Sequence, residues 1–349
     1  MIYSMTKSYG WTRYVVVQGF AMLLGIAAFV VFTVIDPDLI ADKWVYLTIF
    51  NVLFILGLVF FGKGDEVGSR SWYRFAGIGV QPSEIVKVIF IVLLAKQVTN
   101  YKEQRTLNKF PSIIKLGLHW ALYFGLITVI PNDLGSALIF LAIFVIMLVC
   151  AGIAWYWMAA AAAAVAAMVP LFWNFLLKDY QKKRILAPYI PDVVDPTGQG
   201  ITWQTNHCKD ALASGRWTGV GFGEGSFAQS SYNARHTDCI FASIGEELGM
   251  VACIAIIVLL SIIIIRCCVI GLRSGSPFGM LICFGVAAAL AFQTFVNIGM
   301  CIGITPVVGI TLPFFSYGGS SIVAMYAAVG SVSGVKYRPK PRQNFLQYQ

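Results

Sequence analysis

Long runs of apolar residues fill most of the chain, and short polar segments separate them. A helix needs about 20 apolar residues to cross a bilayer, whereas membrane-barrel strands would alternate apolar and polar residues. The pattern predicts about nine transmembrane helices, over residues 14–35, 44–62, 81–98, 113–130, 134–153, 156–176, 239–265, 278–303 and 316–335. The sequence therefore predicts an all-α, polytopic helical membrane protein with a single membrane domain over residues 1–349.

Composition agrees with this pattern. Hydrophobic residues make up 58% and charged residues only 12% of the chain, and the mean hydropathy is +0.76, whereas a soluble domain carries about 25% charged residues. The formal charge of +9 would suggest nucleic acid in a soluble protein. Basic residues of membrane proteins collect in cytoplasmic loops, however, so we expect no nucleic-acid partner.

The basic residues also predict the orientation of the chain. Lys102, Arg105 and Lys109 lie in the linker 99–112, and more basic residues follow Lys336 in the tail; both segments are typical of the cytoplasmic side. With an odd number of spans, the amino terminus then lies outside. Segments 63–80 and 177–238 are expected to be external loops.

The loop 177–238 is the one long polar segment, and we expect the chemistry there. Its glycine-rich and aromatic stretch 217–225 favours an ordered, tightly turned loop. Cys208 and Cys239 flank its second part, and a bridge between them stays an open alternative. Seven basic residues lie in this external loop, among them the cations Arg184, Lys209, Arg216 and Arg235.

Asp238 ends this loop and opens the next apolar helix. A carboxylate there can cap free amide groups, and it can also serve a site, since Arg235 and His236 precede it. Glu246 lies inside the following span, about 80° around an ideal helix from Asp238. An ionisable group at that depth predicts either a role in the same cavity or a buried carboxylate bonded to a neighbour.

Several other polar residues stand at the ends of spans or inside them. Gln81 precedes a helix start in which Glu84 and Lys87 share one face, which predicts an ion pair, with substrate contact as the alternative. Asp133 occupies a short external turn, where capping is the alternative to a site role. Asn297 and Ser316 suit hydrogen bonds between helices or cavities lined by backbone.

Together, these segments resemble the SEDS family (shape, elongation, division and sporulation), which includes RodA, FtsW and SpoVE. The resemblance covers almost the whole chain. It rests on motifs in a fixed order: Gly68-Ser69-Arg70-Ser71-Trp72, Gln81-Pro82-Ser83-Glu84 with Lys87, Asp133-Leu134-Gly135, Tyr180-Gln181 with Arg184, Asp195-Pro196, Gln204, His236-Thr237-Asp238, Gly245-Glu246-Glu247-Leu248-Gly249, Asn297-Ile298-Gly299, and Ser316-Tyr317-Gly318-Gly319-Ser320. The stretch 306–309 and the short tails lean toward the RodA type. Cys239 stands where the family usually has phenylalanine.

The resemblance implies a peptidoglycan glycosyltransferase that polymerises lipid II at the outer face of the cytoplasmic membrane, in cell elongation or division. It implies a class B penicillin-binding protein as partner, Asp238 as the catalytic residue, and Trp72, Gln204 and His236 on the substrate side with the external cations. A site of this chemistry needs a carboxylate base and cations near the diphosphate. The sequence fixes no cofactor and leaves open a divalent cation such as Mg²⁺ or Mn²⁺.

Three further expectations complete the interpretation. A lipid II flippase or transporter is the main alternative, because it also needs charged residues in a cavity, such as Glu84, Lys87 and Glu246. A scaffold that only positions the crosslinking partner is the other. Family members typically have ten spans, and Met1–Ser4 resembles the outer end of their first helix, so the first transmembrane helix of the family is expected to be missing here.

Overall fold

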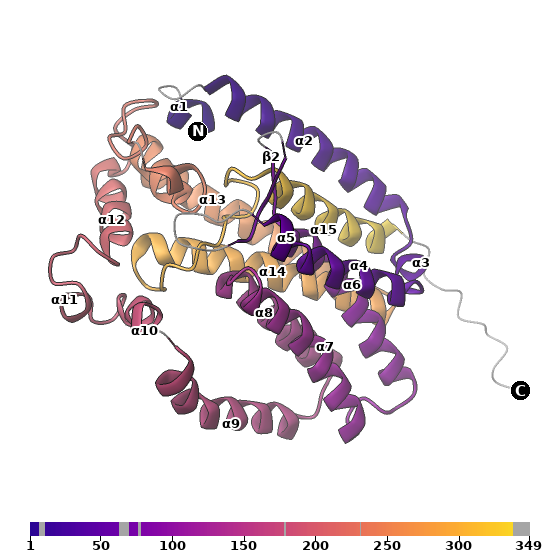
Figure 1. The fold of residues 1–349 in the computed structure, drawn as a ribbon. Coiled ribbons are helices and arrows are strands. Elements are labelled where there is room, and N and C mark those ends of the chain that lie inside the picture. Colours follow the sequence, from indigo (N-terminus) through magenta and orange to yellow (C-terminus); the bar gives the residue numbers. More distant parts are fainter. Residues whose placement is uncertain (7–10, 63–69, 76–77, 178, 231, 338–349) are drawn as a thin grey trace, which may run out of the picture. The chain divides into compact units, whose positions relative to one another are not determined.

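The computed structural model describes residues 1–349 except 7–10, 63–69, 76–77, 178, 231 and 338–349. Three sequence features therefore lie outside the described residues: Gly68-Ser69 of the first motif, Lys178 of the large loop, and the basic tail beyond Tyr337. The remaining chain is almost entirely helical (Figure 1).

The helices cover every predicted span. They are α1 (Ile2–Thr6), α2 (Trp11–Val34), α3 (Pro37–Ala41), α4 (Trp44–Leu56), α5 (Leu58–Phe61), α6 (Pro82–Glu103), α7 (Phe110–Val129), α8 (Leu134–Ala151), α9 (Trp155–Leu171), the π-helical turn η1 (Phe172–Leu176), α10 (Asp179–Leu186), α11 (Pro191–Val194), α12 (Trp203–Gly215), the 3₁₀ turn η2 (Asn233–His236), α13 (Ile240–Arg273), α14 (Pro277–Ile302) and α15 (Gly319–Tyr337). The prediction of a polytopic helical membrane protein is confirmed.

Seven of the described helices are long and apolar enough to cross a membrane. The predicted spans 81–98 and 316–335 correspond to α6 and α15, which are not among the seven. Helix α6 carries Glu84, Lys87 and Lys96 within its length, and α15 is rich in glycine and serine. Both helices are therefore less apolar than the others, and the count of nine spans stays a prediction.

A small antiparallel hairpin was not predicted. Strands β1 (Tyr73–Phe75) and β2 (Ile78–Val80) pair with Tyr73 opposite Val80. The strands are three residues long, too short for the apolar alternation that identifies a strand in a sequence. The hairpin places Trp72 against Gly79, where a Cβ atom would come within 3.0 Å of the indole ring.

The chain forms two compact units, which we describe separately. The first unit comprises Met1–Ala21, Ile153–Ser261 and Leu290–Ser321. Its core gathers small and apolar side chains from the large loop, the start of α13 and the end of α14, among them Met5, Cys208, Phe241 and Cys301. Met5 is fully buried in this core and Met1 packs against it, whereas Tyr3 is exposed.

The second unit comprises Met22–Gly152, Ile262–Ala289 and Ile322–Gln349. Helices α7 and α8 lie side by side in it and both contact α6 (Figure 1). Phe90 stacks edge-on against Tyr123 and lies 5.1 Å from Phe140, between ring centroids. Helix α14 approaches α6 closely at Gly285, where a Cβ atom would come within 2.7 Å of Ile91.

Helix α13 contains a break that the sequence pattern did not predict. Gly249 has φ 79° and ψ 179°, so the helix stops and restarts there. The carbonyls of Glu246 and Glu247 accept hydrogen bonds from residues 220 and 221, and the amides of residues 250 and 251 donate to residues 216 and 217. The expected continuous helix is therefore wrong: segment 216–221 enters the break and satisfies the backbone groups that it frees.

Candidate active site

Asp238 lies in the turn that joins η2 to α13. The helix begins at Ile240, so the N-cap position belongs to Cys239 and Asp238 precedes it by one residue. The side chain is half-buried, and a Cβ atom at Gly309 would lie 3.6 Å from its carboxylate. This position favours a role for Asp238 in a site over a role as the cap of α13.

Three hydrogen bonds fix the backbone of segment 236–238. The amide of Tyr317 donates to the carbonyl of His236 at 2.8 Å. The hydroxyl of Ser316 donates to the carbonyl of the next residue, 237, at 2.6 Å. The side-chain amide of Asn297 donates to the carbonyl of Asp238 at 2.8 Å. Asn297 and Ser316 thus make the hydrogen bonds between elements that the sequence predicted, to the backbone of Asp238 and of Thr237 respectively.

His236 sits in an aromatic cluster. Its ring is edge-on to Tyr14 and to Tyr317, with centroids 5.4 Å away in both cases. Burial, with a smaller effect of the neighbouring Arg235, lowers the pKa of His236 to about 4. At neutral pH the imidazole is therefore uncharged, so it packs within this cluster and is not a cation for a diphosphate.

Arg235 does not lie where the sequence led us to expect. Its side chain is only 4% exposed, and its guanidinium donates to the backbone carbonyls of Tyr232 at 2.8 Å and Met5 at 2.9 Å. A guanidinium buried in this way joins two segments of backbone. We therefore correct the prediction of Arg235 as a substrate cation.

Tyr232 is a residue that the sequence reasoning missed. Its ring lies edge-on to Trp203, with centroids 4.8 Å apart. Burial raises the pKa of the Tyr232 hydroxyl, the charges of Cys239 and Asp238 add to the rise, and Arg184 opposes it. Arg184 and Asp238 thus both lie within electrostatic range of one phenol. No recognisable motif contains Tyr232, so the sequence offered no signal for it.

The other two predicted cations are exposed. Lys209 lies in α12 against Gly303 at the end of α14, where a Cβ atom would collide with its side chain. Arg216 follows α12 with φ 47°, and its carbonyl accepts the hydrogen bond from Met250 in the α13 break. Both side chains are accessible to an anionic ligand.

Gln204 contacts the thiol of Cys239, the residue that follows Asp238. Its side-chain amide donates to the sulfur of Cys239 at 3.1 Å, so it supports the residue next to Asp238. All eight cysteines are free, and the alternative of a Cys208–Cys239 bridge is therefore excluded in this structure.

Glu246 has the structural role that the sequence left open. Its carboxylate accepts hydrogen bonds from the hydroxyl of Ser226 at 3.0 Å and from the amides of Phe227 at 3.0 Å and Ala228 at 2.8 Å. The side chain is 1% exposed. Because these groups surround the carboxylate, Glu246 anchors the glycine-rich loop and does not serve the same cavity as Asp238.

The second unit holds the other predicted polar residues. The side chain of Gln81 donates to Asp133 at 3.0 Å, and Asp133 accepts the amide of Ser136 at 2.9 Å as the N-cap of α8. Desolvation raises the pKa of Asp133, although hydrogen bonds from Ser136 and Gln81 oppose the rise. Lys87 pairs with Glu84 at 2.7 Å, both buried, which is the predicted ion pair.

The sequence matches the FtsW, RodA and SpoVE family, described as cell cycle protein, over residues 1–340. This chain belongs to that family. It is 32% identical over 318 residues to the peptidoglycan glycosyltransferase MrdB of Escherichia coli (strain K12), covering 89% of this chain and 82% of that protein. It is also 32% identical over 330 residues to the probable peptidoglycan glycosyltransferase FtsW of Geobacter metallireducens, covering 93% of this chain and 84% of that protein.

Solved structures of family members have the same fold. A chain from work described as structural coordination of polymerization and crosslinking by a peptidoglycan synthase complex matches with a TM-score of 0.80 at 26% identity, over 97% of this chain and 94% of that one. The Rod shape determining protein RodA of Thermus thermophilus matches with a TM-score of 0.66 at 23% identity, over 93% of this chain and 88% of that one. The family resemblance seen in the sequence is confirmed.

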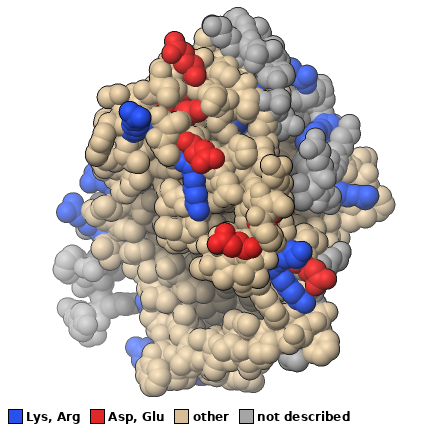
Figure 2. Space-filling view, turned by 90° about the vertical axis from the view of Figure 1, so that its left-hand side faces the viewer, with Lys and Arg blue, Asp and Glu red and all other residues tan. Residues whose placement is uncertain are grey.

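Charges on the large loop are mixed in sign. Figure 2 looks onto the side of the molecule that carries α10, α11 and α12, and blue and red residues are interspersed there. Among the described residues, no three or more His, Cys, Asp or Glu side chains group to hold a metal ion. A Mg²⁺ ion held by one carboxylate and substrate phosphates would not need such a group, so the divalent cation stays a prediction.

Proposed function

We propose that this chain is a peptidoglycan glycosyltransferase that polymerises lipid II into glycan strands, with Asp238 as its general base. Family membership supports the activity, since curated relatives at 32% identity are named for it. The observation that carries the residue assignment is the backbone of segment 236–238, which three hydrogen bonds hold in place beside a half-buried carboxylate. Such fixed positioning is what a proton acceptor needs.

In this proposal, Asp238 takes the proton from the sugar hydroxyl of the acceptor as that oxygen attacks the donor sugar. The bond from the donor sugar to the diphosphate breaks, and the lipid diphosphate leaves with its electron pair. Cations stabilise the charge that develops on the leaving group. Arg184, Lys209 and Arg216 are the residues left for this task once Arg235 is assigned to the backbone.

The partner and the location follow the same reasoning. A class B penicillin-binding protein would crosslink the strands, which agrees with the described pairing of polymerization and crosslinking in the complex that contains a similar chain. We place the protein in the cytoplasmic membrane with Asp238 and segment 177–238 outside. The basic linker 104–109 then lies on the cytoplasmic side, as the distribution of basic residues predicts.

The test is glycan polymerisation by the purified protein supplied with lipid II. Asp238→Asn keeps the size and hydrogen bonding of the side chain but removes the base, so the rate should fall by about 10²- to 10⁴-fold. Asp192→Asn, which makes the same change at an exposed position of α11, should keep the wild-type rate. Both variants should fold and elute as the wild type does.

Other outcomes identify the alternatives. An active Asp238→Asn variant would refute the assignment of the base. A wild-type protein that moves lipid II across a vesicle bilayer without polymerising it would be a flippase. A wild-type protein that does neither, yet increases crosslinking by the penicillin-binding protein, would be a scaffold.

A further inference from the structure

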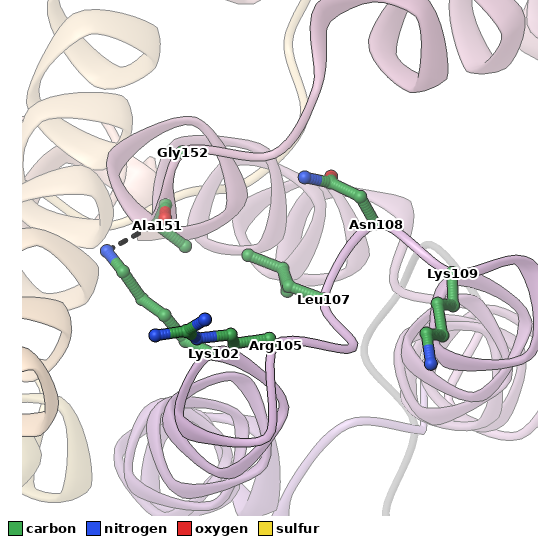
Figure 3. Close-up of a pocket in the computed structure, with 7 residues that line it drawn as sticks. All are labelled: Lys102, Arg105, Leu107, Asn108, Lys109, Ala151 and Gly152. Atoms are coloured by element: carbon green, nitrogen blue, oxygen red, sulfur yellow. Dashed lines mark hydrogen bonds between the residues drawn. The ribbon is translucent and has the colours of Figure 1, made fainter.

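A cavity of about 410 Å³ lies at the junction of α6, α7 and α8, in the second unit. Lys102, Arg105 and Lys109 supply its charge, and the other lining residues are Leu107, Asn108, Ala151 and Gly152. Figure 3 shows Lys102 and Arg105 together at the end of α6, with Leu107 reaching toward Ala151. No acidic residue lines the cavity, and Glu103, the nearest acidic residue in the sequence, is exposed.

The three cations are not equivalent. Lys102 donates to the carbonyl of Ala151 at 3.0 Å, so it stabilises the C-terminal end of α8. Among the described residues, no ion pair joins an acidic side chain to Arg105 or Lys109. Arg105 is therefore the cation beside Lys102 whose charge the protein itself does not balance.

Arg105 also has an unusual backbone. Its φ is 53°, and it occupies the position after the C-cap of α6. The amide of Arg105 donates to residue 102 and that of Thr106 donates to residue 101, which is the Schellman arrangement that ends many helices. Glycine is the usual residue there because it adopts positive φ without strain. A strained residue with a long cationic side chain at the edge of a cavity indicates function rather than stability.

The neighbouring surface is apolar. Phe110, which follows Lys109 of the cavity lining in the sequence, is 62% exposed at the start of α7, and Val149 in the last turn of α8 is 54% exposed. An anion that binds among the cations would thus have apolar protein surface next to it. This combination fits an amphiphile better than a soluble ion, since basic pockets between transmembrane helices on the cytoplasmic side suit lipid head groups.

We propose that this cavity binds the phosphate of an anionic phospholipid head group, with Arg105 as its main cation and the acyl chains along Phe110 and Val149. The phosphate would accept hydrogen bonds from the guanidinium, a geometry that arginine provides and a single ammonium does not. Leu107, which is buried and lines the cavity, would contact the glycerol part of the head group. The site is independent of the glycosyltransferase activity.

Native mass spectrometry of the purified protein tests the proposal, with graded amounts of phosphatidylglycerol or phosphatidylcholine added in detergent. The wild type should retain phosphatidylglycerol in preference to phosphatidylcholine, and salt should weaken the binding. Arg105→Gly should weaken phosphatidylglycerol binding at least about 5-fold, as expected when a charged hydrogen bond of roughly 1 kcal/mol or more is lost, while its Tm stays equal or rises.

Arg266→Gln is the matched control, since it removes one exposed cation of α13 outside the cavity. It should bind phosphatidylglycerol as the wild type does. Equal losses in both variants would show that binding follows total charge and would overturn the site. Equal binding of phosphatidylcholine, or unchanged binding by Arg105→Gly, would also overturn it. Competition by glycerol phosphate at the same concentration as the lipid would assign the site to a soluble phosphate ester and overturn the lipid.

Discussion

The residues around Asp238 divide into those that could react and those that hold them. Asn297 is fully buried and donates to the carbonyls of Asp238 and Ile310. Arg235, three residues before Asp238 in the sequence, donates its hydrogen bonds to backbone carbonyls as well. Proximity in sequence to Asp238 therefore does not distinguish a substrate contact from a residue that supports the backbone, because both roles use the same polar side chains.

His236 makes stability depend on pH. The pKa of His236 is lowered to about 4 in the folded protein, whereas an exposed histidine has a pKa near 6.5. Between these values the unfolded chain binds more protons than the folded one. The stability that neutral His236 contributes is therefore complete above about pH 6.5 and is lost as the pH falls toward 4.

His236→Phe tests this dependence, because phenylalanine keeps the ring contacts with Tyr14 and Tyr317 but cannot titrate. Denaturation in detergent at pH 7 and pH 4.5 measures the free energy of unfolding. Over this interval the wild type should lose on the order of 2 kcal/mol more of that free energy than the variant does. Equal losses in the two proteins would mean that His236 is charged without penalty in the folded state.

The sequence predicted the hydrogen bonds of Asn297 and Ser316 and the Glu84–Lys87 ion pair, because these polar residues lie in or at the ends of apolar spans and need partners. The catalytic role of Asp238 stays a prediction. The sequence did not predict Tyr232. An aromatic residue in a loop is common in any membrane protein, and only the fold brings its phenol near Asp238 and Arg184.

Among the elements, the break in α13 connects the large loop to the membrane helices. The backbone packs directly against backbone there at three glycines, Gly215, Gly219 and Gly249. A Cβ atom at any of them would overlap the backbone of the opposite segment. The sequence predicted that the glycine-rich stretch is tightly turned, but it did not predict that this stretch packs against the break in α13. An isolated glycine in an apolar run does not by itself predict a break, because helices tolerate one.

Gly249→Ala should disrupt this junction. The conformation at Gly249 is almost exclusive to glycine, and the new methyl group would overlap Trp217. We expect the free energy of unfolding to fall by about 3 kcal/mol or more and polymerisation to be lost. Gly125→Ala in α7, where no atom lies within 4 Å, should be neutral or slightly stabilising. Thermal unfolding followed by the tryptophan signal measures both, and equal Tm values would refute the packing argument.

The ion pair of α6 gives a prediction at the same scale. Lys87→Met leaves a buried, uncompensated Glu84 and should cost roughly 3 to 5 kcal/mol, whereas Glu84→Gln with Lys87→Met should cost less, because no lone charge is left. Lys182→Met, in the exposed i, i+3 pair with Asp179, should change stability by less than about 0.5 kcal/mol. Effects that simply add across Glu84 and Lys87 would show that the two are uncoupled.

At the scale of the molecule, the second unit supports the predicted alternation of helix directions. Lys96 pairs with Asp38 at 3.3 Å and Asp42 at 3.0 Å, and Lys102 reaches Ala151, so these helix ends meet. At the other ends, Gln81 contacts Asp133, and Arg70 donates to the carbonyl of Pro131 at 3.2 Å. Linkers that the count of predicted spans assigns to the same side of the membrane thus lie together.

The helical fold was largely predictable, because each span must bury its own backbone hydrogen bonds and therefore shows a long apolar run. The parts that were not predictable lack that constraint. The hairpin is too short to show a period, and helix α12 of the large loop packs Cys208 and Ala211 into a core made by distant segments. Met5 lies near the start of the chain, in the end that the charges place outside, yet it is fully buried.

Labelling with a membrane-impermeant thiol reagent tests the proposed orientation. Thr218→Cys in the large loop and Gln104→Cys at the end of α6 are both exposed positions, whereas a cysteine at position 5 would be buried. In intact cells, Thr218→Cys should react from outside and Gln104→Cys only after permeabilisation. The wild type gives the background, since its eight cysteines are free but mostly buried. Because one crossing of the membrane changes the side, reaction of both positions from outside would place an odd number of additional or missing crossings between them, and it would contradict the cytoplasmic location of the linker 99–112. Reaction of Thr218→Cys only after permeabilisation would contradict the location of Asp238 on the outer face.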